Sequence, residues 1–128
     1  MIDHVSIPVR DLDAAAAFYD RVLAPLDMTR LAERPGTVGY GKRYPEFWLN
    51  ARAGEDVPEN SGHHIGLRCR SEDAVRAFHR AALEAGGRSD GAPGPRQGEM
   101  TTYYGAFILD LDGNKIEAVT FPPPQSSD

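Results

Sequence analysis

The chain has 128 residues, which suits one domain or two small halves that share a core. Its hydrophobic fraction of 41% argues against a disordered chain, and its net charge of −5, without a run of Lys or Arg, argues against binding to nucleic acid or an anionic membrane. The single Cys69 cannot form an internal disulfide, and we find no secretion signal or membrane-spanning apolar run, so we expect a cytoplasmic protein.

The first half of the chain predicts a strand, a helix and three further strands. Residues 5–9 alternate between apolar and mixed side chains, as in a strand with one face on a core. Apolar residues then recur at helical spacing over 15–22, where Asp11 or Asp13 can cap the helix and Pro25 limits it. Three short strands are expected near residues 29–33, 38–42 and 46–51.

The second half predicts the same order of elements. A strand over residues 65–69 precedes a helix that Ser71 can cap and that Gly86 and Gly87 end. The Gly- and Pro-rich stretch "GRSDGAPGPRQGE" predicts a mobile loop beside the site. Two strands, "TTYYGAFILD" and "KIEAVTF", follow, joined by a hairpin turn at "DLDGN".

These halves align as an internal repeat with a constant offset of 60. Residues 4–23, "HVSIPVRDLDAAAAFYDRVL", lie without a gap over residues 64–83, "HIGLRCRSEDAVRAFHRAAL", and His4 falls on His64. We therefore predict an α+β fold of two βαβββ modules whose sheets pair into an incomplete, curved barrel with the helices outside. The single domain is expected over residues 1–121, with half-modules of about 1–60 and 61–121, followed by a flexible tail at 122–128.

Strand alternation divides the first strand of each module into two faces. The apolar face should meet the helices, and the other face should point into the barrel. The side chains expected in the barrel are His4, Ser6, Pro8, His64, Gly66 and Arg68. His63 has the opposite parity and should point away.

Glu117 lies in the middle of the last predicted strand, on the face opposite Ile116 and Ala118. A buried carboxylate requires a partner, which could be a metal ion or Arg68. Together with the two repeated histidines, His4 and His64, it forms a set of two imidazoles and one carboxylate. Such a set leaves coordination positions open on iron, manganese, nickel, cobalt or zinc, as a catalytic site requires.

The sequence resembles the vicinal oxygen chelate superfamily, the glyoxalase, bleomycin resistance and extradiol dioxygenase family. The resemblance covers residues 1 to about 121 and rests on "MIDHVSIPVRDLDAAAAFYDRVLAPL", "HHIGLRC" with its helix ending in "AGG", and "DLDGNKIEAV", where Leu111 replaces the usual Pro. It implies a divalent metal cofactor, a small oxygenated substrate and a homodimer, in which some members complete each metal site across the interface.

The family's metal ligands match His4, His64 and Glu117, and Glu117 would also be the catalytic base if it were displaced from the ion. The family's fourth-strand ligand position falls on Trp48, which weakens a glyoxalase I assignment; whether Glu46 serves as a fourth ligand stays open. The three ligands are more similar to those of thiol transferases and extradiol dioxygenases. However, no basic residues that could bind a phosphonate, as in the transferases, are evident in "RQGEMTTYYG" or in the tail.

The resemblance implies lyase, isomerase, thiol transferase or dioxygenase chemistry. The expected substrate-binding residues are Trp48, Asn50, Ser6, Arg68 and Tyr103. The alternative is a metal-free protein of the bleomycin-resistance type that binds or sequesters a small molecule. In that case His4, His64 and Glu117 would hydrogen-bond one another or Arg68.

Overall fold

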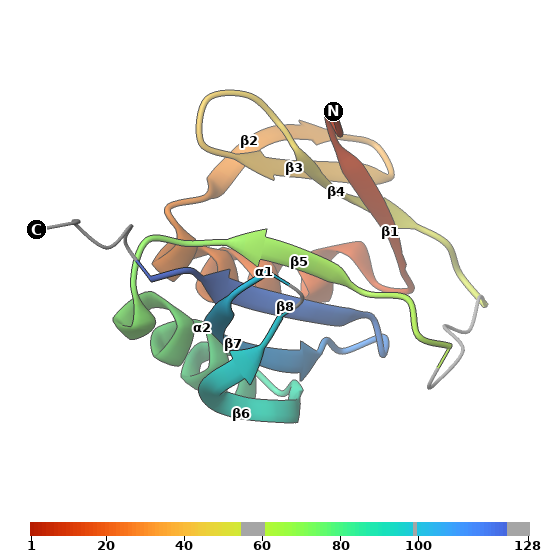
Figure 1. The fold of residues 1–128 in the computed structure, drawn as a ribbon. Helices are drawn as coiled ribbons and strands as arrows, with labels where there is room; N and C mark the ends of the chain where they lie inside the picture. Colours follow the sequence, from red (N-terminus) through yellow and green to blue (C-terminus); the bar gives the residue numbers. More distant parts are fainter. Residues whose placement is uncertain (55–60, 99, 123–128) are drawn as a thin grey trace, which may run out of the picture.

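The computed structural model describes residues 1–54, 61–98 and 100–122, and in them the expected order of elements occurs twice (Figure 1). The first module contains β1 (Val5–Val9), α1 (Leu12–Leu23), the short 3-10 helix η1 (Ala24–Leu26), β2 (Thr29–Arg34), β3 (Thr37–Gly41) and β4 (Phe47–Ala51). The second contains β5 (Ile65–Arg68), α2 (Glu72–Glu84), β6 (Arg88–Gln97), β7 (Thr102–Leu109) and β8 (Lys115–Thr120). The α+β class and the two βαβββ modules are therefore confirmed.

Each module forms its own four-stranded mixed sheet, with orders β1-β4-β3-β2 and β5-β8-β7-β6. The first strand of each module lies parallel to its fourth, with Val5 opposite Phe47 and Ile65 opposite Ile116. The two sheets are not closed into a barrel. No helix in the described ranges is both long and apolar enough to cross a membrane.

Side-chain caps begin both helices. The Asp11 carboxylate accepts a hydrogen bond from the Ala14 amide at 3.1 Å, and the Ser71 hydroxyl does the same for Ala74 at 3.1 Å. Asp11 rather than Asp13 is therefore the cap of α1. Pro25 lies in η1, which continues directly from α1.

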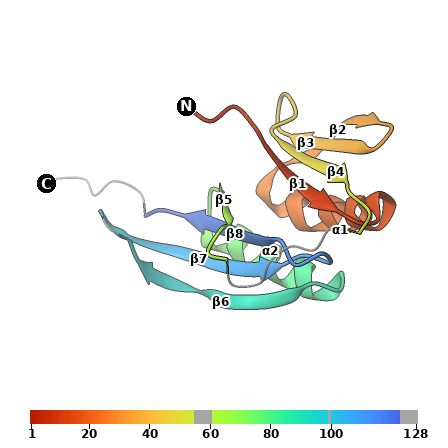
Figure 2. The same ribbon diagram turned by 90° about the vertical axis from the view of Figure 1, so that its right-hand side faces the viewer.

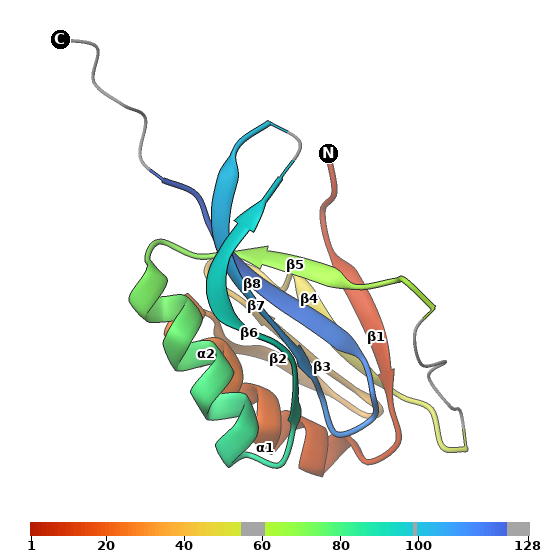
Figure 3. The same cartoon turned by 60° about the horizontal axis from the view of Figure 1, so that its bottom comes forward.

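The prediction of a mobile loop is wrong over residues 88–97. These residues form strand β6, which pairs with β7. The Gly and Pro residues are accommodated because β6 is an edge strand, where a missing amide hydrogen costs little, and because the pairing shifts register between Ser89 and Gly91 and again between Gly91 and Gly94. Figure 3 shows the β6–β7 hairpin extending beyond β5 and β8. Residue 99 of the predicted loop lies outside the described residues.

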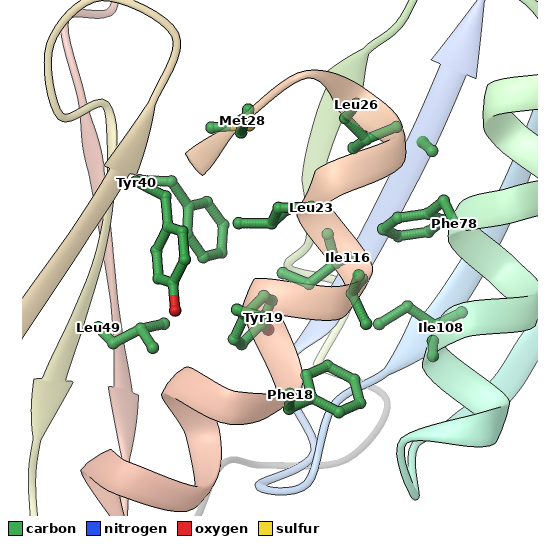
Figure 4. Packing of buried hydrophobic residues seen from close by; sticks show 14 of the residues in the cluster. Phe18, Tyr19, Leu23, Leu26, Met28, Tyr40, Leu49, Phe78, Ile108 and Ile116 are labelled. Carbon is green, nitrogen blue, oxygen red and sulfur yellow. The ribbon is translucent and has the colours of Figure 1, made fainter. Parts of the chain in front are cut away.

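Both helices lie against the apolar faces of the sheets and against each other (Figure 2). In Figure 4, Tyr19 and Leu23 of α1 lie between Tyr40 and Leu49 of the first sheet and Phe78, Ile108 and Ile116 of the second module. These residues belong to one buried cluster. The opposite faces of the two sheets, which carry the candidate site residues, are therefore free of helix.

A polar turn joins the two modules at the end of β7. The buried Asp110 carboxylate accepts hydrogen bonds from the Tyr19 hydroxyl at 2.6 Å, from the amides of Asp112 and Asn114, and from the Asn114 side chain. The Asn114 side chain also donates to the Pro8 carbonyl at 3.0 Å. Burial raises the pKa of Asp110, and the donated hydrogen bonds partly offset the increase. The predicted hairpin turn thus also ties β1 and α1 to the second module.

Candidate functional site

Glu117 lies on the outward face of the second sheet, in the central strand β8. It is opposite Gly66 of β5 and Phe107 of β7, while its neighbours Ile116 and Ala118 point into the core. Its side chain is nonetheless buried, with 6% of the residue exposed. The predicted alternation of β8 is confirmed.

Two polar groups contact the Glu117 carboxylate. His64 Nε2 lies 3.5 Å from Oε1, and the Tyr103 hydroxyl donates a hydrogen bond to Oε2 at 3.2 Å. Two glycines leave room for the carboxylate, because a Cβ added at Gly66 would lie 3.2 Å from Oε1 and one at Gly105 would lie 3.4 Å from Oε2. The surroundings raise the pKa of Tyr103, first by burial and then through the nearby Glu117 charge.

Arg68 was the alternative partner for Glu117. Its guanidinium lies over the Phe121 ring at 4.6 Å, and Phe121 in turn packs against Tyr103 with ring centroids 5.6 Å apart. Within the described part of the chain, no ion pair joins Arg68 to Glu117. The carboxylate is therefore buried with no Lys or Arg bound to it among residues 1–54, 61–98 and 100–122.

Phe107 is a further member of this face that was not among the residues expected from the sequence. Its ring meets His64 edge-on at 5.4 Å, and two cations lie over it: Arg96 at 5.3 Å and Lys115 at 4.6 Å. The signal that could have identified it is the parity of β7, since Phe107 shares a face with Tyr103, which the sequence analysis did place in the site.

The first sheet presents a second group of candidate residues on its own outward face. Ser6 lies opposite Trp48, and Pro8 opposite Asn50. Ser6, Trp48 and Asn50 line an open groove of about 370 Å³, together with His4, Arg34 and Thr37. Arg34 lies over the Trp48 ring at 5.6 Å, and Asn50 accepts a hydrogen bond from Thr37 at 2.9 Å.

His4 is not brought to Glu117. It is exposed and its Nδ1 lies 2.8 Å from the Asp3 carboxylate, although His4, His64 and Glu46 all line a cavity of about 500 Å³ between β1 and β5. His63 contacts Ser61 instead and is exposed. Among the described residues, no three His, Cys, Asp or Glu side chains are close enough together to hold a metal ion. A single chain thus places two of the three candidate ligands together.

The pair formed by His64 and Glu117 suits part of a divalent metal site. Imidazole nitrogen and carboxylate oxygen are common ligands for transition metals, and a buried carboxylate without a cation is energetically costly. A third ligand would have to come from outside this face, and the outward face of the first sheet, with His4 at its edge, offers one.

Comparison with known proteins supports a single family. The family model for the Glyoxalase/Bleomycin resistance protein/Dioxygenase superfamily matches residues 1–118. A glyoxalase/bleomycin resistance protein from Albidiferax ferrireducens T118 is 31% identical, with a TM-score of 0.80 over 92% of this chain and 97% of that one. No match was found among curated proteins.

Two other solved structures share the fold at lower identity. A glyoxalase I mutant from Zea mays is 23% identical, with a TM-score of 0.67 over 91% of this chain and 45% of that one. The fosfomycin resistance protein FosX from Mesorhizobium loti is 20% identical, with a TM-score of 0.66 over 96% of this chain and 93% of that one. At these identities the similarity concerns the fold alone.

Proposed function

Because the chain belongs to the Glyoxalase/Bleomycin resistance protein/Dioxygenase superfamily, we propose that it is a metal-dependent enzyme acting on a small oxygenated molecule. The observation that carries the proposal is Glu117, a buried carboxylate beside the His64 imidazole that no Lys or Arg among the described residues pairs with. A divalent cation would balance this charge, and the imidazole would supply a second ligand.

The proposed ligands are His64 and Glu117 from one chain and His4 from a second copy. The two outward faces are free of helix, so the first sheet of one copy and the second sheet of another are available to face each other. A divalent ion held there, whether iron, manganese, nickel, cobalt or zinc, would act as a Lewis acid toward two neighbouring oxygens of the substrate. Glu46 lines a cavity with His4 and His64 and is not included in this set.

The chain's own residues would orient the substrate around these ligands. Tyr103 holds the Glu117 carboxylate in one orientation through its hydroxyl. Trp48 supplies an apolar wall, and Ser6 and Asn50 supply hydrogen bonds, from the first sheet. Arg68 is positioned by Phe121 to receive a carboxylate. Glu117 would accept a proton if the substrate displaced it from the ion. Lyase, isomerase, thiol transferase and dioxygenase chemistry all fit this arrangement.

The second candidate function is metal-free binding or sequestration of a small molecule. It is favoured by the groove beside Trp48, which the first sheet of a single chain forms, and by the finding that the described residues do not bring three candidate ligands together. In either case we propose one domain over residues 1–121, a tail at 122–128, a cytoplasmic location and a homodimer, with no nucleic-acid or membrane partner.

Metal analysis of the purified protein, followed by titration with iron(II), manganese, nickel, cobalt and zinc, separates the two functions. The matched variant is Glu117→Gln, which keeps the size of the side chain and removes its charge. Under the enzyme proposal, wild-type protein binds one of these metals and Glu117→Gln binds it at least about 10-fold more weakly. A wild-type protein that binds none of them would reject the enzyme proposal and favour sequestration.

A further inference from the structure

The outward face of the second sheet has an excess of positive charge, although the whole chain has a net charge of −5. Three cationic side chains lie near Glu117: Arg68, Arg96 and Lys115. Lys115 is neutralised by Asp90 at 3.0 Å, whereas Arg68 and Arg96 make no ion pair within the described ranges and lie over aromatic rings. A positive area on an acidic protein attracts anions to that area.

Arg96 is held in place without being neutralised. Its guanidinium lies over Phe107 and donates one hydrogen bond, from Nη2 to the Ala92 carbonyl at 2.7 Å. Its Nε is buried without a hydrogen-bond partner in the described chain. Gly91 makes this position possible, because a Cβ there would lie 3.0 Å from Nη2. The result is an oriented guanidinium that keeps most of its hydrogen-bonding capacity.

This guanidinium lies beside the proposed metal ligands. Arg96 is opposite Tyr103, whose hydroxyl contacts Glu117, and both Arg96 and His64 contact the Phe107 ring. A substrate bound at His64 and Glu117 would thus have Arg96 at its side.

We infer that Arg96 binds an oxyanion group of the substrate, a carboxylate or a phosphate-like group, and so selects small anionic substrates. This role differs from the expectation from the sequence, in which "RQGEMTTYYG", the stretch that begins with Arg96, offers no basic residue for such a group. This inference rests on the proposed function for the location of the substrate, and it names a class of substrate that the metal ligands alone do not. Arginine suits the role because its planar guanidinium can donate two parallel hydrogen bonds to such a group. Phe107 keeps the guanidinium in position before the anion arrives.

The test uses inorganic phosphate and acetate as probes on metal-free, ¹⁵N-labelled protein. The side-chain Nε–Hε resonances of all arginines are followed by NMR during each titration. We expect the Arg96 signal to shift saturably, and to be readily observed because its Nε is buried. Arg80, which is exposed on α2 away from this face, is the internal control and should shift little.

Two variants with the same change of charge complete the test. Arg96→Gln should weaken binding of the probes by about 10-fold or more, the loss expected for a charge-assisted hydrogen bond, whereas Arg80→Gln should leave binding unchanged. Equal shifts at Arg96 and Arg80, or unchanged affinity in Arg96→Gln, would overturn the inference. If Arg96→Gln fails to fold, the comparison of the two signals within the wild-type protein still decides.

The outcome is independent of the proposed metal site. A protein that binds metal through Glu117 and shows no selective response at Arg96 keeps the proposed function and loses this inference. A protein that binds no metal but responds selectively at Arg96 loses the enzyme proposal and keeps an oxyanion site.

Discussion

The carboxylate of Glu117 is held by few contacts, and each can be removed by a small substitution. Tyr103→Phe keeps the ring against Phe121 and deletes only the hydroxyl that donates to Glu117 Oε2. If Glu117 binds a metal ion, this loss of orientation should weaken metal binding by about 10-fold, which isothermal titration calorimetry can measure. Tyr104→Phe is the control, because Tyr104 contacts Arg76 of α2 on the other side of the sheet. Equal losses in both variants would contradict a specific role for Tyr103.

Gly66 tests whether the space beside Glu117 is needed. In Gly66→Ala the new Cβ would lie 3.2 Å from Oε1, so the carboxylate must shift and its contact with His64 changes. We expect weaker metal binding with little change in the thermal midpoint of unfolding, measured by calorimetry and by circular dichroism. Gly94→Ala makes the same change on the same sheet, where the nearest atom is 4.0 Å away, and should leave metal binding as it was.

The alternation of side chains along each strand was the basis for predicting the individual site residues. It was correct where alternation alone determines the face on which a side chain lies. His64, Glu117 and Tyr103 lie together on the outward face because β5, β7 and β8 alternate as predicted. Phe107 obeys the same rule, although nothing in the sequence marks it as a site residue besides its parity with Tyr103. The position of His4 could not be predicted, since it depends on how the two sheets are oriented and not on parity within either sheet.

At the scale of elements, the turn between β7 and β8 connects the two modules through hydrogen bonds to α1 and β1. Tyr19→Phe removes the hydroxyl that donates to the buried Asp110 carboxylate, and we expect a loss of about 1–3 kcal/mol in the free energy of unfolding, measured by urea denaturation near pH 7. Tyr44→Phe, a change at an exposed tyrosine, is the control and should leave the free energy of unfolding nearly unchanged.

The effect of Tyr19→Phe should depend on pH. The Tyr19 hydrogen bond lowers the pKa of Asp110 in the folded protein, so its removal raises that pKa further above the value of 3.8 for an unperturbed Asp. The ionised carboxylate needs the donor more than the protonated one does, so the loss of stability should be larger near neutral pH and should shrink as the pH falls through the pKa of Asp110. A loss of equal size at pH 4 and pH 7 would contradict this account.

Helix α2 was predicted correctly from the sequence, whereas strand β6 was not. The helix was predicted because its cap, its apolar spacing and its terminal glycines all agree, and each is local in sequence. Strand β6 was not predicted, because Gly and Pro disfavour strands locally and only the pairing with β7 at the edge of the sheet stabilises them. The bond between Asn114 and Pro8 joins residues 106 positions apart, and nothing local in either segment indicates it.

For the whole molecule, the two outward faces lead to a prediction about assembly. We expect a homodimer in light scattering at micromolar concentration, because one chain does not bring three candidate ligands together in its described residues. A monomer that still binds metal with wild-type affinity would contradict the shared site.

Mixed dimers test the sharing of ligands directly. His4→Ala and Glu117→Gln should each bind metal poorly alone. A heterodimer purified through two different affinity tags should recover one of its two sites, because His4 of one variant would face His64 and Glu117 of the other. If all three ligands acted within one chain, neither chain of the heterodimer would contain a complete set, and metal binding would stay absent.

Strand β8 leaves the ribosome later than all the other described strands. In the folded protein it nevertheless lies inside its sheet, between β5 and β7. Until residues 115–120 emerge, β5 lacks its partner, because among the described strands it pairs with β8 alone. The first module is different, since its own interior strand β4 is complete by residue 51. During synthesis there is therefore a period in which the first half can pair all its strands. In that period the apolar side chains of β5 remain exposed. A translational pause between residues 110 and 120 would prolong this period, and chaperones that bind exposed apolar strands would find their target in the second half of the chain.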